Sequence, residues 1–160
     1  MMLTMIATDG FDVSATTAIR VPVLLALPTL GGVLKERAQQ PEGVVLQVEL
    51  PELRIPFHAT IGVPVLTKIK GLDRHEWSLE MRAATNPSVY PTFHGVLALE
   101  PVGAHACELQ LKGKYAVPLG PLGRAIDATL FRGAAVASLQ RFVDDVAFRV
   151  AERVRASQVM

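Results

Sequence analysis

The sequence predicts an α+β fold in which a curved antiparallel β-sheet wraps around one long C-terminal α-helix. Alternating apolar and polar residues recur between Phe11 and Val117, a period of two that is typical of strands with one buried face. After the Pro- and Gly-rich turn at 118–123, the apolar residues change to a helical spacing that continues to Arg155. Only short turns separate the last five strands, so we expect these strands to pair as an antiparallel meander.

The alternation defines six strands and one region of short helices. The predicted strands are 11–20, 44–50, 53–63, 75–83, 90–100 and 109–117. A polar stretch at 67–74 is expected to connect the third strand to the fourth. Between the first two strands, residues 21–39 predict two short helices, because Leu30-Gly31-Gly32 interrupts the apolar run.

The long helix is predicted at 122–155, where no proline intervenes. At 1.5 Å per residue it would run about 45–50 Å, so it needs a broad partner. An apolar stripe that includes Leu139 and Phe142 defines its buried side. Each strand has one apolar face, which predicts a sheet covered on one side only. A twisted sheet does not close tightly everywhere on a single helix, so we expect a cavity between the two.

Composition narrows the class of protein. The chain has 160 residues, enough for one domain with a substantial core, and half of them are apolar, which excludes a disordered chain. The net charge of +1 is spread without a basic stripe, so we expect no nucleic-acid partner. The single cysteine, Cys107, excludes an internal disulfide and a cysteine-based zinc cluster, and its parity predicts a thiol in the core.

The N-terminal residues carry no basic segment before their apolar positions, so they do not resemble a signal peptide. Prolines and glycines break the longest apolar run, at 21–34, which is too short to span a membrane. By elimination we expect a cytoplasmic protein without an integral membrane segment.

A set of motifs in the second half of the chain indicates a known family. They are Trp77, Tyr90-Pro91, Phe93-His94-Gly95, Leu109-x-Leu-x-Gly-x-Tyr115, Pro118-Leu119-Gly120, Gly123 and Asp127. With this layout the chain resembles the START-like superfamily, also called SRPBCC or Bet v 1-like and related to polyketide cyclases and dehydrases. The resemblance implies a single START-like domain over 1–160 with the helix-grip fold. It also implies a site for lipids, polyketides or similar molecules between sheet and helix.

The resemblance supplies no universal catalytic residue, and the sequence offers no strong one, so none is assigned. His58 and His94 fall on the polar parity of their strands. If the strands pair in order, another strand separates these two histidines by about 9–10 Å, too far to share a metal. We therefore expect neither a metal nor a cofactor.

The candidate ligand-binding residues are those that parity and helical spacing direct inward. They are Phe57, Trp77, Met81, Phe93, Leu97, Leu111, Tyr115, Phe131, Arg132, Ala135, Leu139 and Phe142. Nearly all are apolar, as in sites for apolar ligands, although the same list describes a plain core. Arg132 is the one charge in the set: it either extends along the sheet rim or meets an acidic ligand head group at the mouth.

Three functions fit this set of residues. The first is binding of a small hydrophobic molecule. The second is an enzyme, a polyketide cyclase-like catalyst in which Tyr115 or Arg132 polarises a carbonyl. The third is an interaction module whose cavity is filled by its own side chains. The sequence fixes neither the ligand nor the oligomeric state.

Overall fold

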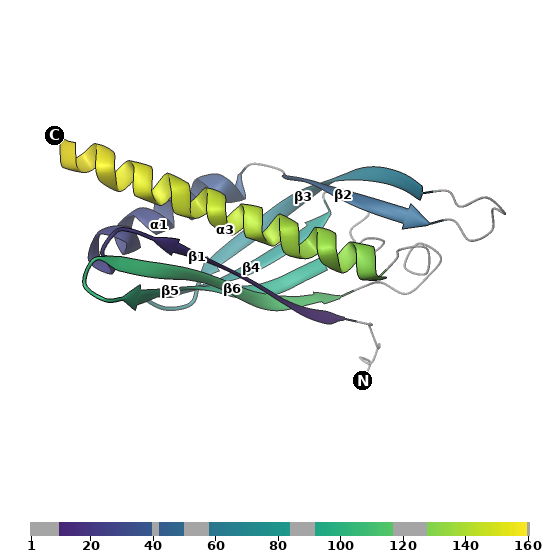
Figure 1. Ribbon diagram of the computed structural model, residues 1–160, viewed down its shortest axis with the longest axis horizontal. Helices are drawn as coiled ribbons and strands as arrows, with labels where there is room; N and C mark the ends of the chain where they lie inside the picture. The colour runs from purple at the N-terminus through teal and green to yellow at the C-terminus, as the bar shows by residue number, and fades with distance from the viewer. Residues whose placement is uncertain (1–9, 40–41, 50–57, 84–91, 117–127, 160) are drawn as a thin grey trace.

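The computed structural model describes residues 10–39, 42–49, 58–83, 92–116 and 128–159. These residues form six strands and two helices (Figure 1). The strands are β1 (Phe11–Ile19), β2 (Glu42–Glu49), β3 (His58–Gly71), β4 (Glu76–Ala83), β5 (Thr92–Val102) and β6 (Ala106–Ala116). The helices are α1 (Val23–Ala38) and α3 (Ala128–Val159).

The strands form one antiparallel sheet in the order β1-β6-β5-β4-β3-β2. The predicted meander from β2 to β6 is confirmed, and β1 joins it by pairing with β6. Both edge strands, β1 and β2, contact α3, although four strands lie between them in the sheet. The sheet therefore curls around the helix, and Figure 1 shows α3 crossing it diagonally.

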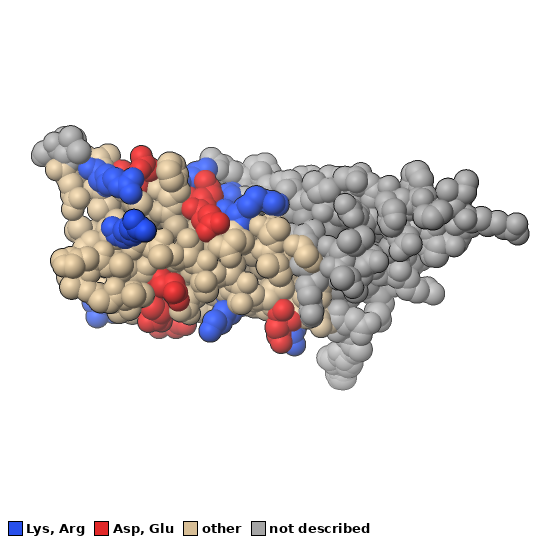
Figure 2. Space-filling model, viewed as in Figure 1, with Lys and Arg blue, Asp and Glu red and all other residues tan. Residues whose placement is uncertain are grey.

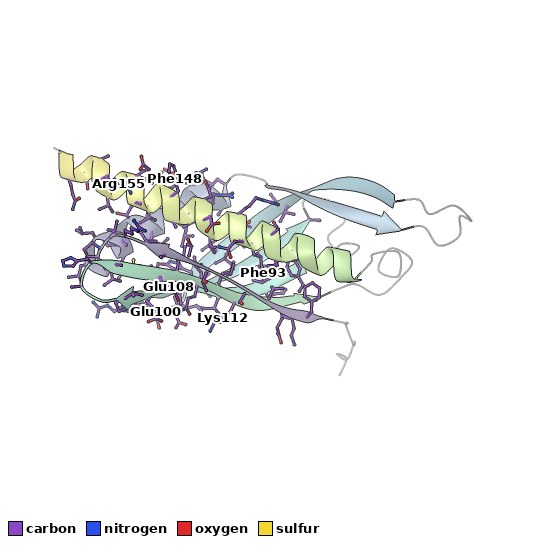
Figure 3. All side chains as sticks on the ribbon, in the orientation of Figure 1. Phe93, Glu100, Glu108, Lys112, Phe148 and Arg155 are labelled. Carbon is purple, nitrogen blue, oxygen red and sulfur yellow. The ribbon has the colours of Figure 1, made fainter. Side chains whose placement is uncertain are left out.

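The long helix is confirmed over the described part of its predicted range. It has 32 residues and ends at Val159, beyond the predicted end, while predicted positions 122–127 lie outside the described residues. The described members of its apolar stripe, among them Leu139 and Phe142, are buried. Phe148 lies on the opposite side, where Figure 3 shows it pointing away from the sheet. The stripe was therefore assigned to the correct face.

The prediction of two short helices after β1 is wrong, because α1 is one continuous helix of 16 residues that contains Pro28. Pro28 cannot donate a hydrogen bond to the carbonyl of Leu24, but Leu24 is exposed and water can reach it. Thr29 Oγ1 donates to the carbonyl of Leu25 at 3.2 Å. Buried residues such as Leu30 and Leu34 anchor the helix on the core, so packing outweighs the two glycines in its middle.

The predicted polar connection at 67–74 is also partly wrong, because β3 continues to Gly71. Thr67, Ile69 and Gly71 pair with β4, whereas the pairing of β3 with β2 ends at Val65. The lysines in this stretch suggested a loop, but they occupy alternate positions and point outward. Cys107 is a core thiol as predicted, with its Sγ 3.4 Å from the carbonyl oxygen of Val21.

Candidate functional site

The inner face of the sheet, which α3 and α1 cover, is organised in rows that run across the strands. The strand register places Thr67, Met81, Phe93, Tyr115 and Phe11 opposite one another in one such row. We call these five residues the aromatic row. Their side chains share one face, because opposite residues in antiparallel strands point the same way.

The other end of the inner face is closed. Leu97, Leu99, Leu109 and Leu111 from β5 and β6 have no accessible surface, and neither have Val146 and Val150 from α3 or Leu30 and Val33 from α1. We call these eight residues the packed end. Complete burial of side chains from the sheet and from both helices indicates close packing at this end. The predicted ligand-site residues Leu97 and Leu111 lie in this closely packed part of the core.

The aromatic row is buried but less completely closed. Met81 and Tyr115 keep 6% and 7% of their surface accessible, whereas Phe93 between them has none. The Phe93 and Tyr115 ring centroids lie 5.2 Å apart, and those of Phe11 and Tyr115 lie 5.6 Å apart. Three rings therefore form a continuous apolar wall on one side of the row, with Met81 beside it.

Two glycines allow Phe93 to lie flat on the sheet. Gly95 and Gly113 are paired opposite each other in the neighbouring row. A methyl group added at Gly95 would lie 2.4 Å from Phe93 Cζ, and one added at Gly113 would lie 2.6 Å from that atom and 2.3 Å from the carbonyl oxygen of His94. Any side chain at either position would push the ring toward the helices. The Phe-x-Gly motif thus positions an aromatic ring.

Thr67 brings a polar atom into the aromatic row. Thr67 keeps only 5% of its surface accessible, and its Oγ1 has no hydrogen-bond partner among the described residues. Partly buried Val65 and Ile69 flank it on β3, and Met81 lies opposite. Thr67 was absent from the predicted site because the polar stretch at 67–74 predicted a loop. The alternation of Val65, Thr67 and Ile69 with exposed residues is the signal that identifies it.

Arg37 is a second residue that sequence reasoning missed. It is buried at the end of α1, where its Nε donates to Asp145 Oδ2 at 2.7 Å. Its guanidinium carbon lies 5.1 Å from the centre of the Phe142 ring. Asp145 also pairs with Arg149, at 3.0 Å. The spacing of Leu30, Leu34 and Arg37 on one helical face is the signal that would have found it. Arg37 joins the two helices over the core.

Burial raises the pKa of two groups in the described interior, the phenol of Tyr115 and the thiol of Cys107. It raises the pKa of Tyr115 from 10 to about 12, so the phenol stays neutral at physiological pH and can donate a hydrogen bond. Burial also raises the pKa of the Cys107 thiol, which keeps this residue in its unreactive form.

Trp77 lies on the inner face opposite Leu97 but is only partly buried. Its ring borders a groove of about 340 Å³ between α1 and the ends of β3 and β4. Gly31 and Lys35 of α1 form the other wall of this groove. The predicted inward orientation is therefore correct, and the neighbouring helix in the groove is α1.

The described candidate residues thus divide between the two ends of the inner face. Met81, Phe93 and Tyr115 belong to the aromatic row, while Leu97 and Leu111 belong to the packed end. From α3, Ala135, Leu139 and Phe142 are buried, with at most 1% of their surface accessible. Phe57 lies outside the described residues, as do the side chains of Phe131 and Arg132.

The outer face of the sheet is polar. His94 is exposed there, with its Nδ1 3.8 Å from Glu80 Oε2, and Arg82 also pairs with Glu80. Strand β4 separates the strands of His58 and His94, as expected. Within the described ranges, no three His, Cys, Asp or Glu side chains gather as a metal site requires. On the face shown in Figure 2, the described positive and negative side chains are interspersed.

No protein-family model and no curated protein matches this sequence. Solved structures do match its fold. Ara h 8.0201 is 10% identical, with 92% of this chain and 99% of that chain covered at a TM-score of 0.53. The ZhuI aromatase/cyclase from Streptomyces sp. R1128 is 14% identical over 91% and 94%, with a TM-score of 0.51. A START superfamily protein from Mycobacterium smegmatis is 12% identical over 93% and 99%, also at 0.51.

These likenesses establish that the chain has the START-like, or SRPBCC, helix-grip fold. The resemblance inferred from the motifs is thereby confirmed at the level of fold. In the part of the chain that the structure describes, no helix has the length and apolar character to cross a membrane.

Proposed function

We propose that the protein binds a small hydrophobic molecule between the sheet and α3, beside the aromatic row. The supporting observation is the contrast within one inner face. Leucines close the packed end completely, whereas Met81 and Tyr115 stay accessible next to an aromatic wall. Apolar ligand sites combine such a lining with a few polar groups. The proteins of known structure with this fold include a START superfamily protein.

The residues that line the proposed site are those predicted from the sequence that lie near the aromatic row. Met81, Phe93 and Tyr115 form its sheet side, and Ala135 and Leu139 form its helix side, while Phe142 packs against Arg37 at the junction of the two helices. The assignments of Phe57, Phe131 and Arg132 to the site stay predictions, because these side chains lie outside the described part of the structure. The site needs no metal and no cofactor. We further propose that the protein works in the cytoplasm and has no nucleic-acid partner.

A binding experiment with a filled-site variant tests the proposal. Calorimetric titration of the wild type with tetralin, a small bicyclic hydrocarbon, should show saturable binding. Met81→Trp places a larger side chain beside Phe93 and should weaken binding at least about tenfold, or 1.4 kcal/mol. Phe148→Ala alters an exposed residue on the same molecule and should change nothing. Mass spectrometry of a solvent extract of the purified protein should identify a retained apolar compound.

Absence of both retained compound and saturable binding would contradict the proposal. It would favour the interaction module, whose interior is filled by its own side chains. The polyketide cyclase-like alternative draws support from Tyr115, a neutral phenol able to polarise a carbonyl in an apolar setting. Among proteins with this fold, ZhuI is an aromatase/cyclase. Turnover that disappears in Tyr115→Phe while binding persists would favour that enzyme.

A further inference from the structure

Thr67 carries a hydroxyl group that the folded chain leaves unpaired in its interior. Its Oγ1 has less than 1 Å² of accessible surface and no hydrogen-bond partner among the described residues. Leaving a buried hydroxyl unpaired costs free energy that valine, a residue of the same shape, avoids. Unsatisfied buried groups are rare, and each has a specific cause, such as a bound water or ion or a functional role.

The residues around Thr67 indicate which kind of ligand group could form a hydrogen bond with its hydroxyl. Val65 and Ile69 flank it, Met81 lies opposite, and exposed Lys68 and Lys70 point to the outer face. Arg37 is the buried charged residue of the described interior, and its guanidinium is paired with Asp145. A carboxylate facing only a neutral hydroxyl in such an environment would be strongly disfavoured. A neutral carbonyl or hydroxyl oxygen matches it, because the threonine hydroxyl both donates and accepts.

The distances between residues of the aromatic row indicate the size of the ligand that would span it. Thr67 and Phe93 stand on strands separated by β4, which corresponds to about 9–10 Å at the usual spacing of strands. The rings of Phe93, Tyr115 and Phe11 continue the row beyond that point. A molecule with an oxygen at one end and a flat apolar body would place the oxygen at Thr67 and the body against the rings. Because Thr67 Oγ1 has almost no accessible surface in the free protein, the flexible Met81 side chain opposite it has to move for the oxygen to reach it.

We propose that Thr67 is a specificity-determining residue that hydrogen-bonds a neutral oxygen, a ketone or an alcohol, of the apolar ligand bound beside the aromatic row. This inference rests on the proposed function and adds the chemical class of the ligand. A ligand oxygen satisfies a group that the free protein leaves unpaired, so the free protein is less stable than it could be. The same hydroxyl therefore affects both stability and selectivity.

Two matched probes separate selectivity from simple apolar binding. Tetralin and 1-tetralone share a bicyclic skeleton, and the ketone has a carbonyl where the hydrocarbon has a methylene group. Calorimetry should show that Thr67→Val weakens tetralone binding about five- to tenfold, as expected for one hydrogen bond, and leaves tetralin binding unchanged. Thr67→Ser keeps the hydroxyl and should keep tetralone binding. Thr16→Val, at an exposed position of β1, is the surface control.

Thermal unfolding of the ligand-free proteins provides an independent readout. Thr67→Val removes an unpaired oxygen and should raise Tm by about 2–4 °C for a domain of this size. A lower Tm would show that the hydroxyl has a structural partner, and this would overturn the inference. Equal loss of tetralin and tetralone binding, or no loss of either, would overturn it while leaving the proposed function intact. No binding of either probe to the wild type would overturn both.

Discussion

The two ends of the inner face share a sheet and a covering helix, yet their residues differ in chemistry and in how completely they are buried. At the packed end, leucines and valines from β5, β6, α1 and α3 have no accessible surface. In the aromatic row, Met81 and Tyr115 remain partly accessible and Thr67 holds an unpaired oxygen. The packed end resembles an ordinary hydrophobic core, whereas the aromatic row combines an apolar wall with an unsatisfied polar atom. The proposed ligand site therefore lies at the end where burial is less complete.

The helix α1 accounts for much of this difference. It contacts α3, β3, β5 and β6 and adds Leu30, Val33 and Leu34 to the core. Ion pairs hold it on α3, between Arg37 and Asp145 and between Glu36 and Arg153. The helix α1 thus covers the packed end together with α3, whereas α3 alone would leave the curved sheet partly open there. The closed end is therefore a product of two helices.

The largest effect should come from breaking the junction of the two helices. Phe142 is 1% accessible and lies against the Arg37 guanidinium, so Phe142→Ala would leave a cavity and remove a cation–π contact. We expect a loss of about 3–5 kcal/mol in the free energy of unfolding, measured in urea. Phe148→Ala removes an equal ring from the same helix at a position that is 64% accessible, and should cost less than about 0.5 kcal/mol.

A smaller loss in Phe142→Ala, near about 1–2 kcal/mol, would place an existing void beside the ring. The open region would then extend from the aromatic row to the helix junction. Equal effects of the two substitutions would contradict the assignment of Phe142 to closed core.

The contrast between the ends also explains what could be predicted from the sequence. Strand alternation and the stripe through Leu139 and Phe142 depend on local periodicity, which a sequence displays directly. The family motifs predicted the fold, because Gly95 and Gly113 leave the space on the sheet that the Phe93 ring occupies. Periodicity shows which face is buried, but it does not show where that face is solid. Leu97 and Met81 therefore looked equivalent in the sequence, although Leu97 has no accessible surface and Met81 keeps 6% of its surface accessible.

The misses have a shared physical cause. Pro28 and the glycines of α1 suggested a break, and the lysines after Thr67 suggested a loop, because local propensity favours both. Packing on the core reversed the first expectation, and pairing with β4 reversed the second. As a result the unpaired Thr67 hydroxyl and the buried Arg37 were both absent from the predicted site. Each depends on contacts between segments far apart in sequence.

An intermediate effect should come from Gly113→Ala, which tests how the aromatic row is built. The added methyl group would meet the His94 carbonyl oxygen, the Gly95 Cα and the Phe93 ring at 2.3–2.6 Å. Two of these three atoms are backbone, so the sheet itself must shift, and we expect a loss of about 1–3 kcal/mol or more. Near-ultraviolet circular dichroism should also change as the Phe93 and Tyr115 rings separate.

Gly133→Ala is the matched control for this substitution. Gly133 lies inside α3, and an added methyl group has no atom within 4 Å, so alanine should raise stability by about 0.5–1 kcal/mol. If Gly113→Ala were also neutral or stabilising, Phe93 would not lie flat against the sheet. The aromatic wall of the proposed site would then need a different arrangement.

The smallest expected effect is a change in the pH dependence of the free energy of unfolding on replacement of Tyr115. It is also the most direct measure of solvent exposure in the aromatic row. Burial raises the pKa of Tyr115 from 10 to about 12, so above pH 10 the unfolded chain loses this proton while the folded protein keeps it. The folded state then binds more protons, and stability must fall as pH rises from 10 to 12, with the full contribution present below pH 10. Urea unfolding at pH 8 and pH 11 should show that the wild type loses about 1 kcal/mol more than Tyr115→Phe. Lysines and other groups that titrate in this range are common to both proteins and cancel in the comparison. An identical pH dependence would mean that the phenol ionises as it does in water and that the Tyr115 end of the aromatic row is open to solvent.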